Sequence, residues 1–381
     1  MDVLFDYRPA LVGRTGVGEY VHELAAGLAR RRPREARLHL FSTSWKDRLA
    51  PGPELSGEGV VLHDSRIPVR LLHLLWHTSG VPPIEWLTQR RYDIVHAAHP
   101  LLIPSRAGAR VATVYDLDFL DHPERTEREV RRDYRRLVRS HARRADGLLA
   151  ISDSTRRAVV ERLGVSPGRV IVARAGVPAW ARGGRTRPRP ETGPILFLGT
   201  LEPRKNVGAL LDAYEQLLAT RLAVPPLCLA GRSTAAASGW LERAARAPLA
   251  GHVQVTGYVP DGERRALLES AAVLVLPSWN EGFGLPVLEA MALEVPVVVS
   301  NRGALPEVAG DAALYCDPAD PMSLASALAA VLDDRDATNR RVELGRARVA
   351  GWSWDDAAET VWEWYRDMAA RRPGEARADR G

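Results

Sequence analysis

The sequence contains almost no lysine: of its 52 basic residues only Lys46 and Lys205 are lysines, and the rest are arginines. Cysteine is equally scarce, because Cys228 and Cys316 are the only two and both lie in or beside apolar stretches. We therefore expect buried free thiols and not a secreted domain held by disulfides. No spacing of cysteine and histidine indicates a structural metal site, so we expect neither a metal nor another cofactor.

Long apolar runs are missing as well. The sequence has no run of 18 apolar residues that could cross a bilayer, and Met1 to Asp6 lacks the basic start of a signal peptide. We therefore expect a cytoplasmic protein. No compact region combines basic residues with interleaved aromatic ones, so a nucleic-acid partner is not expected. The net charge of +5 suits an anionic ligand or an anionic membrane surface.

The chain is long enough for two domains, with 381 residues of which 46% are apolar. Apolar strand-like runs alternate with amphipathic helical segments throughout, which predicts a parallel α/β architecture. The predicted strands lie at residues 3–5, 38–41, 94–96, 111–114, 148–151 and 170–172 in the first domain, and at 195–198, 227–230, 253–256, 272–276, 296–300 and 313–315 in the second.

The domain boundaries follow from composition. Residues 185–194 are rich in proline, glycine and charge and form the predicted linker between an N-terminal domain, 1–184, and a C-terminal domain, 195–353. Residues 354–372 form a predicted helix with a broad apolar face, suited to packing on another surface. Residues 373–381 are expected to be a flexible tail.

Two segments of the first domain each admit two interpretations. Residues 67–87 contain several leucines and two tryptophans, so they form either a core helix, which we favour, or an apolar surface that contacts a membrane or a lipid-linked acceptor. Residues 125–144 contain nine arginines interleaved with acidic residues, which suits a solvated helix face or contact with anionic lipid. The second interpretation of each segment would place the protein peripherally on the inner face of the membrane.

The chemically richest segment follows the predicted strand at 272–276. A glycine-containing turn leads from this strand into a helix that begins near Leu285, and a helix N-terminus reached through glycines is a typical anion site. One glutamate lies in the turn and a second lies in the helix, eight residues later, which suits a ligand that is part phosphate and part polyol. The alternative is an ordinary strand-to-helix turn with two solvated glutamates. The residues concerned are Glu281, Gly282, Gly284 and Glu289.

A second charged turn follows the strand at 195–198. Arg204 and Lys205 place two adjacent cations near the carboxyl end of a buried strand, which is costly unless an anion is bound there. An arginine fork beside a lysine point charge is a common pairing for a diphosphate. The alternative is an exposed basic turn.

The first domain offers two further positions at predicted strand ends. Gly16 and Gly18, in the loop after the first strand, allow the backbone to approach a ligand. Tyr115 and Asp116 place polar groups directly after the strand at 111–114. Open α/β sheets bind their ligands at such carboxyl ends.

Taken together, these motifs resemble glycosyltransferase family 4, the retaining nucleotide-sugar transferases of GT-B fold. The resemblance covers most of the chain and is strongest in GTLEPRKN (199–206), LAG (229–231), TGYVPDGE (256–263), PSWNEGFGLPVLEAMA (277–292) and GALPEVAGDAAL (303–314). Weaker matches in the first domain are GVGEY (16–20), VYDL (114–117) and Ala145-Asp146. It implies two Rossmann-like domains facing a cleft, with the last helix crossing back to the first domain.

The resemblance also implies roles for individual residues. Lys205 and Arg204 would neutralise the donor diphosphate, Glu281 would contact the hydroxyls of the transferred sugar, and these three are the implied catalytic residues. Glu289 would hold the ribose, and the backbone near Tyr258 would meet the base. The implied donor-binding residues are Gly16, Gly18, Tyr115, Asp116, Thr200, Gly231, Tyr258, Val259, Gly282, Phe283, Gly284, Leu285 and Glu289.

The sequence departs from the family pattern at three places. Many members have arginine where Thr200 stands, so Arg204 would carry that charge here. Many have histidine where Tyr115 stands, which puts the identity of the sugar in question. Leu293-Glu294 replaces the usual Cys-Gly pair without removing a chemical group.

The implied reaction is transfer of a hexose from a nucleoside-diphosphate sugar with retained anomeric configuration, GDP-mannose being slightly favoured over a UDP-hexose. The acceptor would be a hydroxyl of a saccharide, a lipid-linked molecule or a small molecule. Two alternatives stay open: a nucleotide-sugar epimerase on the same fold, and a catalytically weak relative that binds nucleotide sugars.

Overall fold

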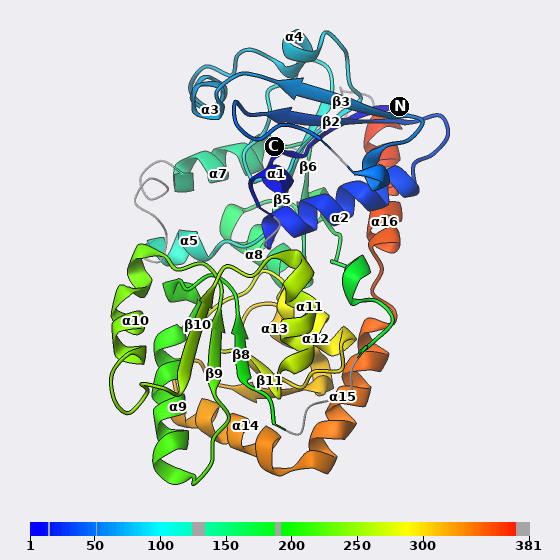
Figure 1. Ribbon diagram of the computed structural model, residues 1–381. Helices are drawn as coiled ribbons and strands as arrows, with labels where there is room; N and C mark the ends of the chain where they lie inside the picture. Colours follow the sequence, from blue (N-terminus) through cyan, green and yellow to red (C-terminus); the bar gives the residue numbers. More distant parts are fainter. Residues whose placement is uncertain (14–15, 51, 124–133, 187–191, 371–381) are drawn as a thin grey trace. The chain divides into compact units, whose positions relative to one another are not determined.

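The structure, a computed structural model, describes residues 1–13, 16–50, 52–123, 134–186 and 192–370. The chain divides into two compact units (Figure 1). Unit 1 comprises Met1–Ala175 together with Ser353–Gly381, and unit 2 comprises Gly176–Trp352. Each unit is built around its own parallel sheet.

The sheet of unit 1 has seven parallel strands in the order β3-β2-β1-β4-β5-β6-β7. Its strands are β1 (Asp2–Asp6), β2 (Arg37–Thr43), β3 (Val60–Ser65), β4 (Ile94–Ala97), β5 (Ala109–Val114), β6 (Gly147–Ala150) and β7 (Val170–Val172). Its described helices are α1 (Arg8–Val12), α2 (Val17–Arg30), α3 (Val69–Thr78), α4 (Ile84–Thr88), α5 (Asp118–Asp121), α7 (Tyr134–Arg144), α8 (Asp153–Leu163) and α16 (Trp354–Ala370).

Six of these seven strands coincide with predicted ones, and β3 was not predicted. Most of the predicted strands are almost wholly buried, and parallel strands buried on both faces have near-continuous apolar sequences. β7, at the other end of the sheet, is predicted although only its first residue is buried. β3 lies at the end of the sheet, is only partly buried and includes His63 and Asp64. An edge strand with mixed polarity gives little periodic signal, which is why the sequence pattern did not reveal it.

Residues 67–87 form two helices, α3 and α4, and not the single core helix that the sequence favoured. Leu72 and Trp76 of α3 are buried in the core of unit 1. Leu71 and Leu74, on the same helix, are 51% and 60% exposed. Both faces of α3 thus contain apolar side chains, and the described residues of unit 1 cover only one of them.

The arginine-rich segment is described only from Tyr134 onwards. There α7 buries Val138, His141 and Ala142 and leaves most of its arginines exposed. The acidic residues expected to pair with these arginines lie at 124–133, outside the described residues.

The last helix, α16, packs on unit 1. The indole Nε1 of Trp362 donates to the carbonyl of Leu28 at 3.0 Å, and the hydroxyl of Tyr365 contacts Nδ1 of His96. Trp354 packs edge-on against Tyr20 with ring centroids 5.2 Å apart. The expected tail at 373–381 lies outside the described residues.

The sheet of unit 2 has six parallel strands in the order β10-β9-β8-β11-β12-β13. They are β8 (Ile195–Leu198), β9 (Leu227–Ala230), β10 (Val253–Gly257), β11 (Val273–Leu276), β12 (Val297–Ser300) and β13 (Ala313–Cys316), all of them predicted. The helices are α9 (Val207–Thr220), α10 (Ser238–Ala244), α11 (Asp261–Ser270), α12 (Leu285–Ala292), α13 (Leu305–Ala309), α14 (Pro321–Asp333) and α15 (Arg335–Val349).

The division between the units differs from the predicted linker at 185–194, because residues 176–184 belong to unit 2. The amide of Val177 donates to the carbonyl of Trp352 at 3.1 Å. The guanidinium of Arg265 donates to the carbonyls of Trp180 and Gly184. These hydrogen bonds bind a segment without apolar periodicity to unit 2, which composition could not indicate. Residues 187–191 of the predicted linker lie outside the described residues.

Both cysteines are buried free thiols, as expected. None of the helices in the described parts of the chain is long and apolar enough to cross a membrane.

Candidate active site

The order of strands in unit 2 reverses between β8 and β11. β9 and β10 lie on one side of β8, and β12 and β13 lie beyond β11. Ligands of open α/β sheets bind beyond the carboxyl ends of the strands at such a reversal. The two turns singled out in the sequence, 199–206 and 277–284, directly follow β8 and β11. Unit 2 therefore places both predicted turns at the expected ligand-binding position.

Hydrogen bonds hold these two turns against each other. The amide of Trp279 donates to the carbonyl of Arg204 at 2.9 Å. The side chain of Asn206, which is buried, donates to the carbonyls of Pro277 at 3.1 Å and Pro318 at 2.8 Å. Asn206 has a φ of +60°, a left-handed conformation that asparagine tolerates better than most residues. In the Arg-Lys-Asn motif, Arg204 and Lys205 thus provide the charges, and Asn206 holds the two turns together.

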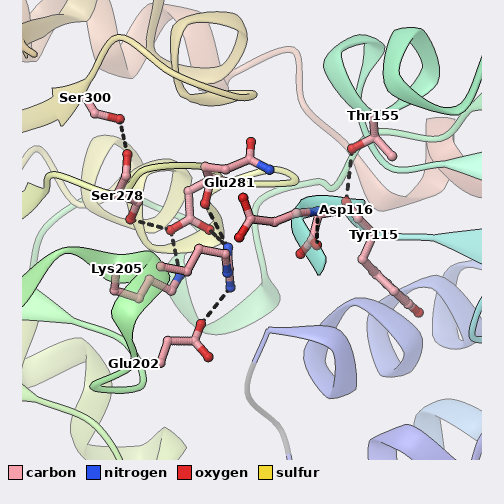
Figure 2. A network of polar contacts seen from close by, with 11 residues as sticks. Tyr115, Asp116, Thr155, Glu202, Lys205, Ser278, Glu281 and Ser300 are labelled. Carbon is pink, nitrogen blue, oxygen red and sulfur yellow. Dashed lines mark hydrogen bonds and ion pairs between the residues drawn. The ribbon is translucent and has the colours of Figure 1, made fainter. Parts of the chain in front are cut away.

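Glu281 is the centre of a charged network in unit 2 (Figure 2). Its Oε1 accepts hydrogen bonds from Nζ of Lys205 at 2.6 Å and from Oγ of Ser278 at 2.7 Å. Its Oε2 accepts from Nη1 of Arg204 at 3.2 Å. Arg204 also binds Oε1 of Glu202 at 2.8 Å. We call Glu281, Lys205, Arg204, Ser278 and Glu202 the Glu281 network.

The electrostatic balance of the network holds Glu281 ionised. Burial by itself would raise the pKa of this carboxyl, but the charges of Lys205 and Arg204 and the hydrogen bonds from Lys205 and Ser278 outweigh it. The pKa of Glu281 is lowered to about 2. At neutral pH the side chain is therefore a buried carboxylate, 6% exposed, bound by two cations.

The network corrects two alternatives left open by the sequence. Glu281 is not a solvated glutamate, because it is buried. Arg204 and Lys205 do not form an exposed basic turn, because their side chains are only 19% and 12% exposed. The anionic partner that two adjacent cations were expected to need is, in this structure, the carboxylate of Glu281. With Glu202 included, the network has two positive and two negative charges.

Glu289, the second glutamate of the motif, is wholly buried and also bound by an arginine. One of its carboxylate oxygens lies 2.6 Å from Nη2 of Arg264 in α11. The guanidinium of Arg264 lies over the ring of Trp180, 5.6 Å from its centroid. The solvated alternative is therefore wrong for Glu289 as well. Its predicted role in holding the ribose stays a prediction.

The turn between the two glutamates buries its apolar side chains. Phe283 is buried and packs edge-on against Trp352 with ring centroids 5.6 Å apart, and Leu285 is also buried. Gly282 is buried too, and Gly284, with a φ of +101°, is the N-cap of α12. This arrangement turns the side chains into the unit, as a turn that binds a ligand through its backbone requires.

The neighbouring strand ends contain Thr200, Gly231, Tyr258 and Val259. A Cβ atom at Gly231 would lie 1.9 Å from the carbonyl oxygen of Gly199, so no larger residue fits there without moving the backbone. Thr200 and Val259 are half-buried, and Tyr258 is 40% exposed. All four lie at the carboxyl ends of β8, β9 and β10.

The predicted site residues of the first domain lie in unit 1. Gly16 is the N-cap of α2, and a Cβ atom at Gly18 would lie 1.8 Å from the carbonyl oxygen of Gly13. The hydroxyl of Tyr115 donates to the carbonyl of Ala98 at 3.0 Å.

The turn after β5 is also held by hydrogen bonds. The carbonyl of Tyr115 accepts from Oγ1 of Thr155 at 3.0 Å (Figure 2). Asp116 accepts from the amide of Asp118 at 3.2 Å. Contact of Tyr115 and Asp116 with the donor stays a prediction.

Three residues that contact predicted site residues were not singled out from the sequence: Ser278, Glu202 and Arg264. Ser278 lies three residues before Glu281, a Ser-x-x-Glu spacing that could have drawn attention to it. Nothing in the sequence connects Arg264 with Glu289, because 25 positions separate them. Among the described residues, no group of three or more histidine, cysteine, aspartate and glutamate side chains is arranged to hold a metal ion.

Comparison with known proteins agrees with this geometry. A family model described as glycosyl transferases group 1 matches residues 186–348, and one described as glycosyltransferase family 4 matches residues 14–179. A glycogen synthase of Mycobacterium tuberculosis is 30% identical over 97% of this chain and 94% of its own length. The chain belongs to glycosyltransferase family 4.

Other similar proteins agree with this membership. The O-antigen chain mannosyltransferase B of Escherichia coli is 28% identical to this family 4 chain, over 93% of this chain and 97% of its own length. The solved structure of sucrose-phosphate synthase from Thermosynechococcus elongatus superposes with a TM-score of 0.77 at 20% identity, covering 97% of this chain and 99% of that one. The family 4 chain has the expected GT-B fold of two Rossmann-like domains and is a hexosyltransferase.

Proposed function

We propose that this glycosyltransferase moves a hexose from a nucleoside-diphosphate sugar, with GDP-mannose as the favoured donor, to a hydroxyl of an acceptor with retained anomeric configuration. The observation that carries the proposal is the Glu281 network, in which two cations and a buried carboxylate converge at the strand reversal of unit 2. The mannosyltransferase of Escherichia coli supports the choice of sugar, because its name states that it transfers mannose.

The proposed chemistry breaks one bond of the sugar carbon and forms another. The bond between the sugar carbon and the diphosphate oxygen breaks, so the negative charge that develops on the diphosphate must be stabilised. Lys205 and Arg204, already held in place by Glu281, are preorganised cations of the kind that gives such stabilisation. The new bond joins the same sugar carbon to the acceptor oxygen, and the acceptor proton passes to the departing phosphate oxygen.

The charge balance of the network defines how the diphosphate would be bound. Since Glu281 and Glu202 already neutralise Lys205 and Arg204, the network has no net positive charge. A diphosphate would share the two cations with Glu281, and the N-terminal backbone of α12 would add N–H donors. We propose that this arrangement works without a metal ion or another cofactor.

We further propose that the acceptor belongs to a lipid-linked or saccharide class and that the protein touches an anionic membrane. The uncovered face of α3 exposes Leu71 and Leu74, and Arg66 and Arg70 are exposed in the same segment. Apolar side chains beside arginines suit the surface of an anionic bilayer. Co-sedimentation with vesicles that contain anionic lipid, and release by Leu74→Asp, would support this contact, whereas equal recovery with neutral vesicles would oppose it.

The test of the proposed reaction is a panel of GDP, UDP, ADP and TDP and their sugars, measured by the thermal shift of the full chain. Only nucleotides that bind stabilise the fold. The preferred nucleotide sugar is then incubated with saccharide and lipid-linked acceptors, and NMR of the product gives the anomeric configuration. Transfer with inversion would refute the retaining mechanism. Donor isomerisation without acceptor would identify an epimerase, and binding without turnover would identify a catalytically weak relative.

A further inference from the structure

Arg232 and Tyr258 form an exposed pair at the carboxyl ends of the neighbouring strands β9 and β10. Arg232 is the second residue after β9, and Tyr258 is the first residue after β10. The guanidinium carbon of Arg232 lies over the ring of Tyr258, 4.8 Å from its centroid. Both side chains are exposed. This places an arginine fork, backed by an aromatic ring, at the end of the sheet where ligands bind.

The backbone beneath this pair is held on two sides. The amide of Gly231 donates to the carbonyl of Gly257 at 2.7 Å, which connects the ends of β9 and β10. The carbonyl of Arg232 accepts from the amide of Leu201 at 2.8 Å, which connects it to the turn after β8. Arg232 therefore projects from a backbone that is held in place and hydrogen-bonded to the turn containing Arg204 and Lys205.

The guanidinium of Arg232 contacts a different kind of group from those of three other arginines in unit 2. Arg204, Arg221 and Arg243 each direct the guanidinium to a carboxylate at 2.5–2.8 Å. For Arg232, the described parts of the chain provide the tyrosine ring and no carboxylate within ion-pair distance. A guanidinium that lies over a ring can still donate hydrogen bonds along the edges of its own plane. Its donors are thus available to a planar ligand.

The geometry of an arginine fork selects among nucleobases. Guanine presents two neighbouring acceptors, N7 and O6, which match the two parallel N–H donors of the fork. Adenine presents N7 beside an amino group, which is itself a donor and opposes the guanidinium. Uracil does not have two adjacent acceptors on that edge. An arginine placed beside the base therefore favours guanine.

We propose that Arg232, supported by Tyr258, reads the N7 and O6 edge of guanine and so makes this chain specific for guanosine diphosphate donors. The inference rests on the proposed function, since it requires that unit 2 binds a nucleoside diphosphate. It adds a specificity-determining residue, Arg232, that lies next to Gly231 but was not among the predicted site residues.

The experiment measures the binding of GDP, IDP, ADP and UDP to the full chain by calorimetry. IDP keeps the N7 and O6 of GDP but lacks its amino group. We expect Arg232→Ala to weaken GDP and IDP about 10- to 100-fold, the range of one bidentate arginine contact. ADP and UDP should change by less than about threefold, because the fork is not matched to them.

Three further variants and one matched control distinguish recognition of the base from a simple effect of charge. Arg232→Lys keeps the charge without the fork, so it should lose most of the preference for GDP. Tyr258→Phe keeps the ring and should bind GDP like the parent chain, whereas Tyr258→Ala should lose part of the preference. Arg246→Ala is the matched control, because Arg246 is an exposed arginine of unit 2 that pairs with Glu242 at 3.6 Å. It should leave all four affinities unchanged.

Specific outcomes would overturn the inference. Equal weakening of all four nucleotides by Arg232→Ala would mean that Arg232 acts on the phosphates or on the fold. A parent chain that binds UDP or ADP more tightly than GDP would exclude guanine reading and GDP-mannose as the donor, while leaving the proposed hexosyl transfer from another nucleotide sugar intact. Failure of the parent chain to bind any of the four would overturn the proposed function as well.

Discussion

Glu281→Gln is the substitution that tests the charged network most directly. Glutamine keeps the size of the side chain and one carbonyl acceptor but removes the negative charge. Lys205 and Arg204 would then remain as largely buried cations, with Glu202 as the remaining carboxylate of the network. Removing one partner of a buried ion pair destabilises because the other charge is left uncompensated.

The magnitude follows from the ionisation of Glu281. Its pKa is lowered from 4.5 to about 2 in the folded chain. A shift of this size corresponds to about 3 kcal/mol of favourable interaction of the ionised form in the folded state. We therefore expect Glu281→Gln to lower the free energy of unfolding of unit 2 by about 3 kcal/mol at pH 7. For a unit of this length that is roughly 6–12 °C in Tm.

The pH dependence identifies the cause. Because the folded pKa is below the unfolded one, the stabilisation is fully present above about pH 4.5 and is lost as the pH falls towards 2. The stability difference between the parent chain and Glu281→Gln should therefore shrink over that interval. Urea unfolding of both proteins between pH 7 and pH 3 measures it.

The matched control is Glu202→Gln, which removes the other carboxylate bound to Arg204. The side chain of Glu202 is 28% exposed, so water screens its charge and we expect a loss below about 1 kcal/mol. A Glu281→Gln variant as stable as the parent chain, or a difference that stays constant from pH 7 to pH 3, would refute the electrostatic account.

Three further predictions concern the site and the fold. Lys205→Ala should weaken the binding of GDP about 10- to 100-fold and the binding of guanosine little, as calorimetry would measure. Adding Glu281→Gln should restore part of the GDP affinity, because it removes the repulsion between the diphosphate and a carboxylate that Lys205 no longer neutralises. Equal losses for GDP and guanosine would mean that Lys205 does not face the diphosphate. EDTA should change the transfer rate by less than about twofold, and inhibition reversed by a divalent ion would contradict the metal-free proposal. Trp362→Ala should destabilise unit 1 by about 3–5 kcal/mol in urea unfolding, because this ring is buried and hydrogen-bonded to Leu28; an unchanged midpoint would show that α16 contributes little to that unit.

Local pattern was enough to predict most of the architecture. All the strands of unit 2 and all but β3 in unit 1 were predicted, because most of them are buried on both faces and are recognisable as short apolar runs. β10 was predicted although its residues are half-buried or exposed. β3 was not predicted, because its apolar part is only three residues long and is followed by His63, Asp64 and Ser65. The sequence pattern failed also at 176–184, which belongs to unit 2 through hydrogen bonds that leave no trace in composition.

For the candidate site too, some features could be predicted from the sequence and others could not. The sequence alone determined which groups are available: two adjacent cations, glycines before a helix and two glutamates eight residues apart, since all of these are local features. Only the tertiary structure decided their partners. Lys205 and Glu281 are 76 residues apart in sequence and meet because β8 and β11 are neighbours in the sheet. Arg232 lies on Tyr258 because β9 and β10 are neighbours in the same sheet, and Glu289 of α12 binds Arg264 of α11. Which charge neutralises which depends on strand order, and strand order is a property of the whole sheet and not of any one segment.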